Sequence, residues 1–211
     1  MNHIVLAGDS VFDNRRYTKG GDDVITHLRG RIPTEWQATL LAVDGDCIED
    51  VEGQLRDLPD DATHVIVSVG GNDALRNSDI IIEQEEKSSS EVLFMLADRA
   101  TAFEARYRAM LDALLKLRCK IGVCTVYYPQ YEDPSFQKAA VAALTVFNDV
   151  IIRQAFRAGL PLIDLRLVCN EQEDYANEIE PSVRGGSKIA TAIVQMTTNH
   201  NFENRRTEVF I

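Results

Sequence analysis

Three short polar motifs, each following an apolar run, hold the residue types that acyl-transfer chemistry requires. They read Gly8-Asp9-Ser10, Asp44-Gly45-Asp46 and Gly70-Gly71-Asn72-Asp73. A serine hydroxyl is a nucleophile once a base takes its proton. A glycine N–H and an asparagine side-chain amide can both donate to the oxyanion that forms on the attacked carbonyl. Each motif alone is a weak signal, because glycine-rich turns follow parallel strands for backbone reasons. Together, and in this order, they predict a serine nucleophile beside an oxyanion hole.

The apolar pattern of the chain predicts a fold that brings these motifs together. Strands are predicted at 3–7, 38–43, 64–69, 121–126 and 160–163, and helices at 22–31, 48–58, 91–117, 135–158 and 186–196. This alternation is typical of a three-layer α/β/α fold, in which helices cover both faces of a five-stranded parallel sheet. The motifs then lie at the carboxyl edge of the sheet, where such folds bind ligands. We expect one domain over residues 1–211.

With these motifs in this order, the chain resembles the GDSL/SGNH hydrolase family over nearly its whole length. The resemblance implies a flavodoxin-like SGNH hydrolase fold. It also implies that Ser10, in the block Ala7-Gly8-Asp9-Ser10-Val11-Phe12-Asp13, is the nucleophile. The backbone N–H groups of Ser10 and Gly45 and the side chain of Asn72 then correspond to the oxyanion hole of the family.

The fourth block of the family pattern is altered in this sequence. The family has Asp-x-x-His followed by proline and a glycine-led helix, whereas this chain has Asn177-Glu178-Ile179-Glu180-Pro181 and then Gly185-Gly186. Pro181 and the two glycines fix the alignment, so Asn177 stands at the aspartate position and Glu180 at the histidine position. An alignment that starts from Asp174 loses the proline, and we reject it.

Glu180 leaves two functions open. As a substitute base it would support a serine hydrolase, similar to an esterase or lipase, that acts on a small ester or acyl conjugate through Ser10. Carboxylates accept protons weakly at their ordinary pKa of about 4.3, and burial raises that value. As a structural residue, Glu180 would leave a catalytically impaired family member that binds a small ligand, because its charge repels an oxyanion. A third interpretation, a divalent-metal site at Asp44, Asp46 and Asp73, explains the glycine-rich motifs less well. We expect no metal and no cofactor.

None of the four histidines is placed to replace the missing base. His3 and His64 are expected at the amino ends of their strands, far from the carboxyl edge. His27 falls in the first predicted helix, and His200 reaches the site only if the tail folds over it or comes from a second subunit.

Three further residues are candidates for contact with substrate. Asp13 lies three residues after Ser10, although an aspartate there is also a common turn or helix-start residue. Asp73 follows Asn72 at the same edge. Tyr128, together with Tyr127 after the fourth strand, would form an apolar wall for an acyl group, with loop packing as the alternative.

Composition limits the classes of binding partner and the cellular compartment that we expect. A formal net charge of −11 argues against nucleic acid, whose binding depends on lysine and arginine. We expect a cytoplasmic protein, because the four cysteines form no CxxC pair and neither a signal peptide nor a membrane span is evident.

Residues 83–90 are expected to form a surface loop, a lid or the capped start of the next helix. The tail from 199 to 211 docks either on the body or on a second subunit. The sequence does not fix the oligomeric state.

Overall fold

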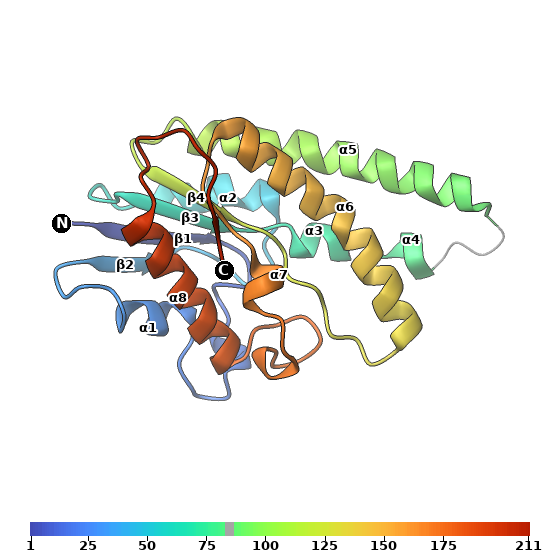
Figure 1. Cartoon of the computed structure of the whole chain (residues 1–211), viewed down its shortest axis with the longest axis horizontal. Coiled ribbons are helices and arrows are strands. Elements are labelled where there is room, and N and C mark those ends of the chain that lie inside the picture. The colour runs from blue at the N-terminus through green and yellow to red at the C-terminus, as the bar shows by residue number, and fades with distance from the viewer. Residues whose placement is uncertain (83–86) are drawn as a thin grey trace.

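The computed structural model of the protein, which describes residues 1–82 and 87–211, has a parallel sheet between two layers of helices (Figure 1). Within that described part, the strands are β1 (His3–Gly8), β2 (Gln37–Leu40), β3 (His64–Ser68), β4 (Lys120–Cys124), β5 (Leu162–Ile163) and β6 (Val209–Phe210). The sheet order is β2-β1-β3-β4-β5-β6 and every pairing is parallel. The predicted three-layer α/β fold is therefore confirmed.

The sheet has six strands rather than the five that we predicted. The additional strand, β6, comes from the tail, whose docking site the sequence left open. The Leu162 N–H donates to the Glu208 carbonyl and the Asp164 N–H to the Phe210 carbonyl, each at 2.9 Å. A strand of two residues carries no periodicity, so it can be recognised only once its partner strand is in place.

The predicted helices lie close to their expected positions: the first is shorter, the last is longer at both ends, and the two long ones differ by a few residues at most. The helices of the described residues are α1 (Val24–Arg29), α2 (Val51–Gln54), α3 (Gly71–Leu75), α4 (Asp79–Ile82), α5 (Ser89–Leu114), α6 (Pro134–Ala158), α7 (Leu165–Val168) and α8 (Val183–Asn199), with 3₁₀ helices η1 (Arg15–Tyr17), η2 (Ile48–Asp50), η3 (Leu55–Asp57) and η4 (Gln172–Asp174). Helices α3, α4 and α7 were not predicted. The helix predicted over 48–58 is divided into η2, α2 and η3. Ser88 caps α5 as expected, because its side chain accepts from the Glu91 N–H; residues 83–86 of the predicted loop lie outside the described residues.

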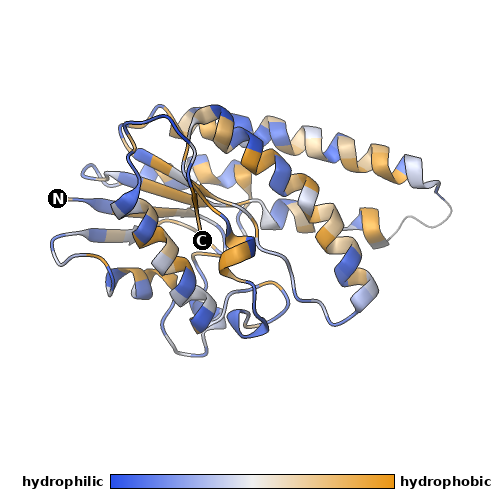
Figure 2. Cartoon of the chain, in the orientation of Figure 1, coloured by the Kyte–Doolittle hydropathy of each residue, from blue (hydrophilic) through white to orange (hydrophobic). Residues whose placement is uncertain are grey.

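Alternation along β1 divides the apolar interior into two cores. Ile4 and Leu6 pack in the core that α1 and α8 cover, whereas Val5 and Ala7 pack in the core with residues of α2, α5 and α6. This is the period-two pattern of a strand buried on both faces. In Figure 2 the strands are largely hydrophobic, and the long helices alternate between hydrophobic and hydrophilic residues.

Helix α6 is both long and apolar. Among the described residues it is the one helix that passes for a membrane span by length and composition, a test that core helices of soluble proteins also pass. In this fold its buried Asn148 is tied to the segment after β4: the Asn148 side chain accepts from the Val126 N–H and donates to the Val126 carbonyl, both at 2.8 Å. Figure 1 shows the N-terminal half of α6 extending beyond the sheet, beside α4.

Candidate active site

Ser10 lies two residues beyond the end of β1, at the carboxyl edge of the sheet. Gly8, the last residue of β1, has φ +127°, and a Cβ atom there would collide with the Ser68 carbonyl of β3. Only glycine allows the two strands to end this closely together. The chain then turns, with the Asp9 N–H donating to the Ser68 carbonyl at 3.0 Å. This turn leaves the Ser10 hydroxyl at the end of the strand.

The Ser10 hydroxyl donates a hydrogen bond to Glu180. The distance from Ser10 Oγ to Glu180 Oε1 is 3.1 Å, and both residues are buried, with 8% and 6% of their surface exposed. The separation is within the reach of direct proton transfer between a nucleophile and its base. Position 180, which holds histidine in the family pattern, thus brings a carboxylate to the serine.

A short loop holds Glu180 over Ser10. Its ends are joined by a bridge between Tyr175 and Pro181, and the Ala176 N–H donates to the Glu180 carbonyl at 2.8 Å. Asn177 closes the loop, because its side-chain oxygen accepts from the N–H groups of Ile179 at 3.0 Å and Glu180 at 2.9 Å. Asn177 therefore orients the backbone of Glu180 rather than its carboxylate.

The loop is attached to its neighbours on two sides. The Tyr127 hydroxyl donates to the Ile179 carbonyl at 2.6 Å, and the Asn14 side chain donates to the Pro181 carbonyl at 3.1 Å. These contacts join the segments after β4 and β1 to the loop, so the carboxylate is held from both sides.

Burial makes Glu180 a stronger base than an ordinary glutamate. Desolvation, opposed by the hydrogen bond from Ser10 and reinforced by the nearby charge of Asp44, raises the pKa of Glu180 to about 7. Its second carboxylate oxygen, Oε2, is buried and has no hydrogen-bond partner in the described part of the chain. A buried carboxylate oxygen without a donor is costly, and it is suited to accept from a substrate or a water molecule.

The three candidate oxyanion donors lie on the segments that follow β1, β2 and β3. In the described residues, neither the Ser10 N–H nor the Gly45 N–H has an acceptor. Gly45 has φ +93°, a conformation that favours glycine, in the turn after β2. Asn72 is the second residue of α3, and its side-chain amide donates one hydrogen to the Asp46 carbonyl at 2.8 Å. Its other amide hydrogen has no acceptor among the described residues. The sheet order β2-β1-β3 places these three strand ends side by side.

Asp9 is a buried carboxyl group that lines the same pocket as Ser10 and Glu180. Burial, with smaller contributions from the charges of Glu180 and Asp73, raises the pKa of Asp9 to about 8, against the opposing hydrogen bond from the Val11 N–H. At neutral pH it is mainly protonated, so it adds no second negative charge beside Ser10. The sequence motif contained Asp9 without indicating this property.

Gln54 of α2 connects the end of β1 to the turn at residues 44–46, which carries the candidate oxyanion donor Gly45 and is called the oxyanion turn below. Its side chain accepts from the Gly8 N–H at 2.8 Å and donates at 2.7 Å to both the Gly8 carbonyl and a carboxylate oxygen of Asp46. It is almost fully buried. Sequence reasoning missed this residue, because its partners lie 46 and 8 residues away along the chain.

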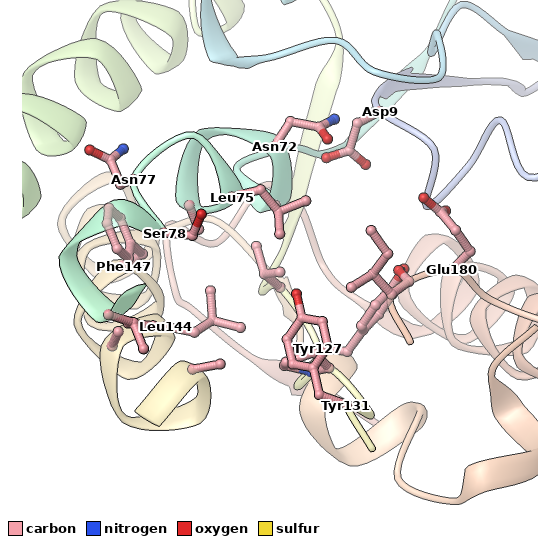
Figure 3. Close-up of a pocket in the computed structure, with 18 of the residues that line it drawn as sticks. Asp9, Asn72, Leu75, Asn77, Ser78, Tyr127, Tyr131, Leu144, Phe147 and Glu180 are labelled. Carbon is pink, nitrogen blue, oxygen red and sulfur yellow. The ribbon is translucent and has the colours of Figure 1, made fainter. Parts of the chain in front are cut away.

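A pocket of about 820 Å³, including the part open to solvent, extends from Ser10 and Glu180 toward α3, α4 and α6. In Figure 3, Asp9 and Glu180 lie on one side of the view and Leu144 and Phe147 on the other. Asp9, Ser10, Asn72 and Glu180 form its polar end. The remaining walls include Leu75, Ile80, Ile81, Val126, Tyr127, Pro129, Phe136, Ala140, Ala143, Leu144, Phe147 and Ile179.

The three predicted substrate-contact residues do not line this pocket. Asp13 instead accepts from the Asp44 N–H at 3.0 Å and so supports the oxyanion turn. Asp73 accepts from the Ile48 N–H at 3.1 Å and pairs with Arg106. The ring of Tyr128 packs under Arg166, 6.0 Å away, and its neighbour Tyr127 lines the pocket. Consecutive side chains point in opposite directions in extended chain, which is why one tyrosine lines the pocket and the other does not.

The histidines lie away from Ser10, as we predicted, and none of the four forms a hydrogen bond with it. His3 contacts Asp61 and Thr39, and His27 contacts the Val183 carbonyl. His64 and His200 both pack on Phe202, away from the carboxyl edge.

The carboxylates of the metal interpretation contact protein donors instead. Asp44 accepts from Arg16 and Tyr17, Asp46 from Gln54, and Asp73 from the backbone of Ile48. No group of three potential ligands in the described part of the chain is arranged to hold a metal ion.

The chain matches one family model and resembles solved structures in fold. Residues 6–185 match the model of the GDSL-like lipase/acylhydrolase family, and no curated protein matches the sequence. The lipase Lip_vut3 from a goat rumen metagenome superposes with a TM-score of 0.73 at 17% identity, covering 96% of this chain and 100% of that one. An extracellular lipase from Streptomyces rimosus gives 0.68 at 17% identity, with 94% and 100% covered. An acetyl xylan esterase from Geobacillus stearothermophilus gives 0.60 at 17% identity, with 95% and 96% covered.

Proposed function

Because the chain belongs to the GDSL-like lipase/acylhydrolase family, we propose that it hydrolyses small acyl esters, with Ser10 as nucleophile and Glu180 as general base. The observation that carries this proposal is the 3.1 Å hydrogen bond from Ser10 Oγ to a Glu180 carboxylate whose pKa is raised to about 7. A base with a pKa near the working pH is the most effective proton acceptor.

In the first half of the reaction, Ser10 Oγ attacks the ester carbonyl carbon and Glu180 Oε1 takes the hydroxyl proton. The carbonyl oxygen becomes an oxyanion, and the N–H groups of Ser10 and Gly45 and the free amide hydrogen of Asn72 bind it. The ester C–O bond then breaks, and the leaving alcohol receives the proton from Glu180. The product of this half is acyl-Ser10.

In the second half, water attacks acyl-Ser10. Glu180 takes the water proton, and the unpartnered Oε2 offers an acceptor for that water inside the pocket. The Ser10 ester bond breaks, Ser10 Oγ takes the proton back from Glu180, and the carboxylic acid leaves. Each half transfers one proton to Glu180 and returns it, so no external reductant, oxidant or metal enters the balance.

A ligand-binding protein without turnover is the second candidate, and one feature favours it. When histidine is the base, the imidazolium attracts the oxyanion, whereas a glutamate that takes the proton only becomes neutral. The pocket would then bind an acyl compound and release it unchanged.

Turnover of p-nitrophenyl esters separates the two candidates. We expect Ser10→Ala to abolish hydrolysis and Glu180→Gln to lower kcat by about 10²- to 10⁴-fold, the usual contribution of a general base. Ser135→Ala, on exposed helix surface, is the matched control and should leave the rate unchanged. Equal rates for the wild type and Ser10→Ala would contradict the proposal.

A further inference from the structure

The pocket beside Ser10 has the shape and chemistry of a site for an alkyl chain. Away from the polar end, the pocket is lined by apolar side chains that include Leu75, Ile80, Val126, Leu144, Phe147 and Ile179. Alkyl groups gain free energy by leaving water for such surroundings. An acetyl group would leave most of these walls uncovered.

Few polar groups interrupt this surface. Asn77 borders the pocket, but its amide already donates to the Asp73 carbonyl and accepts from Arg99. The remaining polar side chains of the described lining outside the reactive end belong to Ser78, Tyr131 and Tyr127, whose hydroxyl donates to the Ile179 carbonyl. All three are neutral, so away from Asp9 and Glu180 this lining offers no counter-ion to a charged group and few hydrogen-bond partners to a sugar.

The turn that carries Gly45 has a different character. The oxyanion turn carries Asp44, which binds the Tyr17 hydroxyl and the exposed side chain of Arg16. A polar, solvent-facing surface suits a leaving group that departs into water. The apolar pocket suits the group that stays covalently attached to Ser10 while water enters.

We propose that the pocket between Ser10 and helices α3, α4 and α6 binds the acyl chain, and that the preferred substrates are esters of medium-length fatty acyl groups rather than acetyl esters. This inference rests on the proposed function and names its substrate class. The inference groups this protein with the lipases among its structural neighbours rather than with the acetyl xylan esterase.

The test is a series of p-nitrophenyl acetate, butyrate, hexanoate and octanoate. We expect kcat/KM to rise about fourfold per methylene until the pocket is filled, which corresponds to about 0.8 kcal/mol per buried CH₂. Octyl acetate, which carries the long chain on the alcohol, should be a poor substrate. A profile that is flat or falls from acetate onward, or a preference for octyl acetate, would overturn the inference while leaving ester hydrolysis intact.

A matched pair of substitutions on α6 tests whether the acyl chain binds in this pocket. Ala143 lines the pocket, and its neighbour Ala142 is exposed and does not. Ala143→Phe should remove the gain from octanoate over acetate, whereas Ala142→Phe, with the same cost in helix propensity, should keep it. Ala140→Phe, which also fills the pocket, serves if Ala143→Phe does not fold. If Ala142→Phe loses the preference for octanoate over acetate as much as the pocket variants do, the assignment of the pocket to the acyl chain is contradicted.

A binding measurement keeps the inference testable even if the protein turns over no ester. Calorimetry on Ser10→Ala should show tighter binding of octanamide than of acetamide, and Ala143→Phe in that background should remove the difference. No difference between the amides would overturn the inference. The same difference without any ester turnover would uphold the pocket and refute hydrolysis.

Discussion

The proposed chemistry at Ser10 depends on two carboxyl groups in different charge states. Glu180 must be ionised to accept a proton, whereas Asp9 is useful only while it is neutral. Burial raises the pKa of both groups, to about 7 for Glu180 and about 8 for Asp9. The described lining of the pocket includes no lysine, arginine or histidine, so stabilisation of the proposed oxyanion depends on the N–H donors and on keeping Asp9 uncharged.

This arrangement predicts a bell-shaped pH dependence of kcat/KM. Activity should rise with pH through about 7, as Glu180 loses its proton and becomes a base, and fall above about 8, as Asp9 ionises and adds negative charge. Asp9→Asn should remove the alkaline fall and keep the rise. A rise centred near the ordinary pKa of a glutamate, about 4.3, would contradict the assignment of Glu180 as the base.

Much of the site at residue scale could be predicted. Ser10, Gly45 and Asn72 follow the carboxyl ends of β1, β2 and β3, and parallel strands bring these ends to one edge of the sheet whatever the details of the helices. The alignment through Pro181 also placed Glu180 beside the serine. The charge state of Asp9 could not be predicted, because a raised pKa depends on burial by residues distant in sequence.

At the scale of elements, the oxyanion turn is held by α2 through a single side chain. Gln54 contacts the backbone of Gly8 and the carboxylate of Asp46, so it couples the end of β1 to the turn that carries Gly45. Predicting one helix over 48–58 gave no reason to single it out. A polar side chain on a predicted helix looks the same whether it faces water or a buried backbone.

Gln54→Leu should therefore weaken both folding and catalysis. The substitution leaves the Gly8 N–H without its acceptor, and a buried unsatisfied group costs about 1–3 kcal/mol. The Gly8 carbonyl loses one of two donors and keeps the Val43 N–H at 3.1 Å. Chemical denaturation should show the loss of stability, and kcat/KM should fall because Gly45 is less well positioned. Gln195→Leu, on the exposed side of α8, is the control. Wild-type behaviour of Gln54→Leu would contradict the positioning role.

Helix α6 shows a second limit of sequence reasoning at this scale. The sequence predicted a helix over 135–158 without saying what its apolar residues contact, and Val150 and Ile151 pack in the core. Ala140 and Ala143 line the pocket, and Leu144 and Phe147 belong to both. Apolar periodicity marks a face that avoids water, and it does not distinguish a core from an alkyl-binding pocket.

At the scale of the whole molecule, the alternation of apolar runs determined the layers and the side of the sheet on which the site lies. The tail was the part that the pattern left open. It forms β6 beside β5, and His200 packs with Phe202 and Phe210. The tail is thereby held away from Ser10, which removes the one route by which a histidine of the same chain would have reached the site.

The central claim is that Glu180 activates Ser10, and labelling by a fluorophosphonate tests it most directly. The probe forms a stable bond only with an activated serine, and peptide mass spectrometry identifies the modified residue. We expect one label on Ser10 in the wild type, none in Ser10→Ala, and a labelling rate at least about 10²-fold lower in Glu180→Gln. An unlabelled wild type, or equal rates in the wild type and Glu180→Gln, would contradict the account.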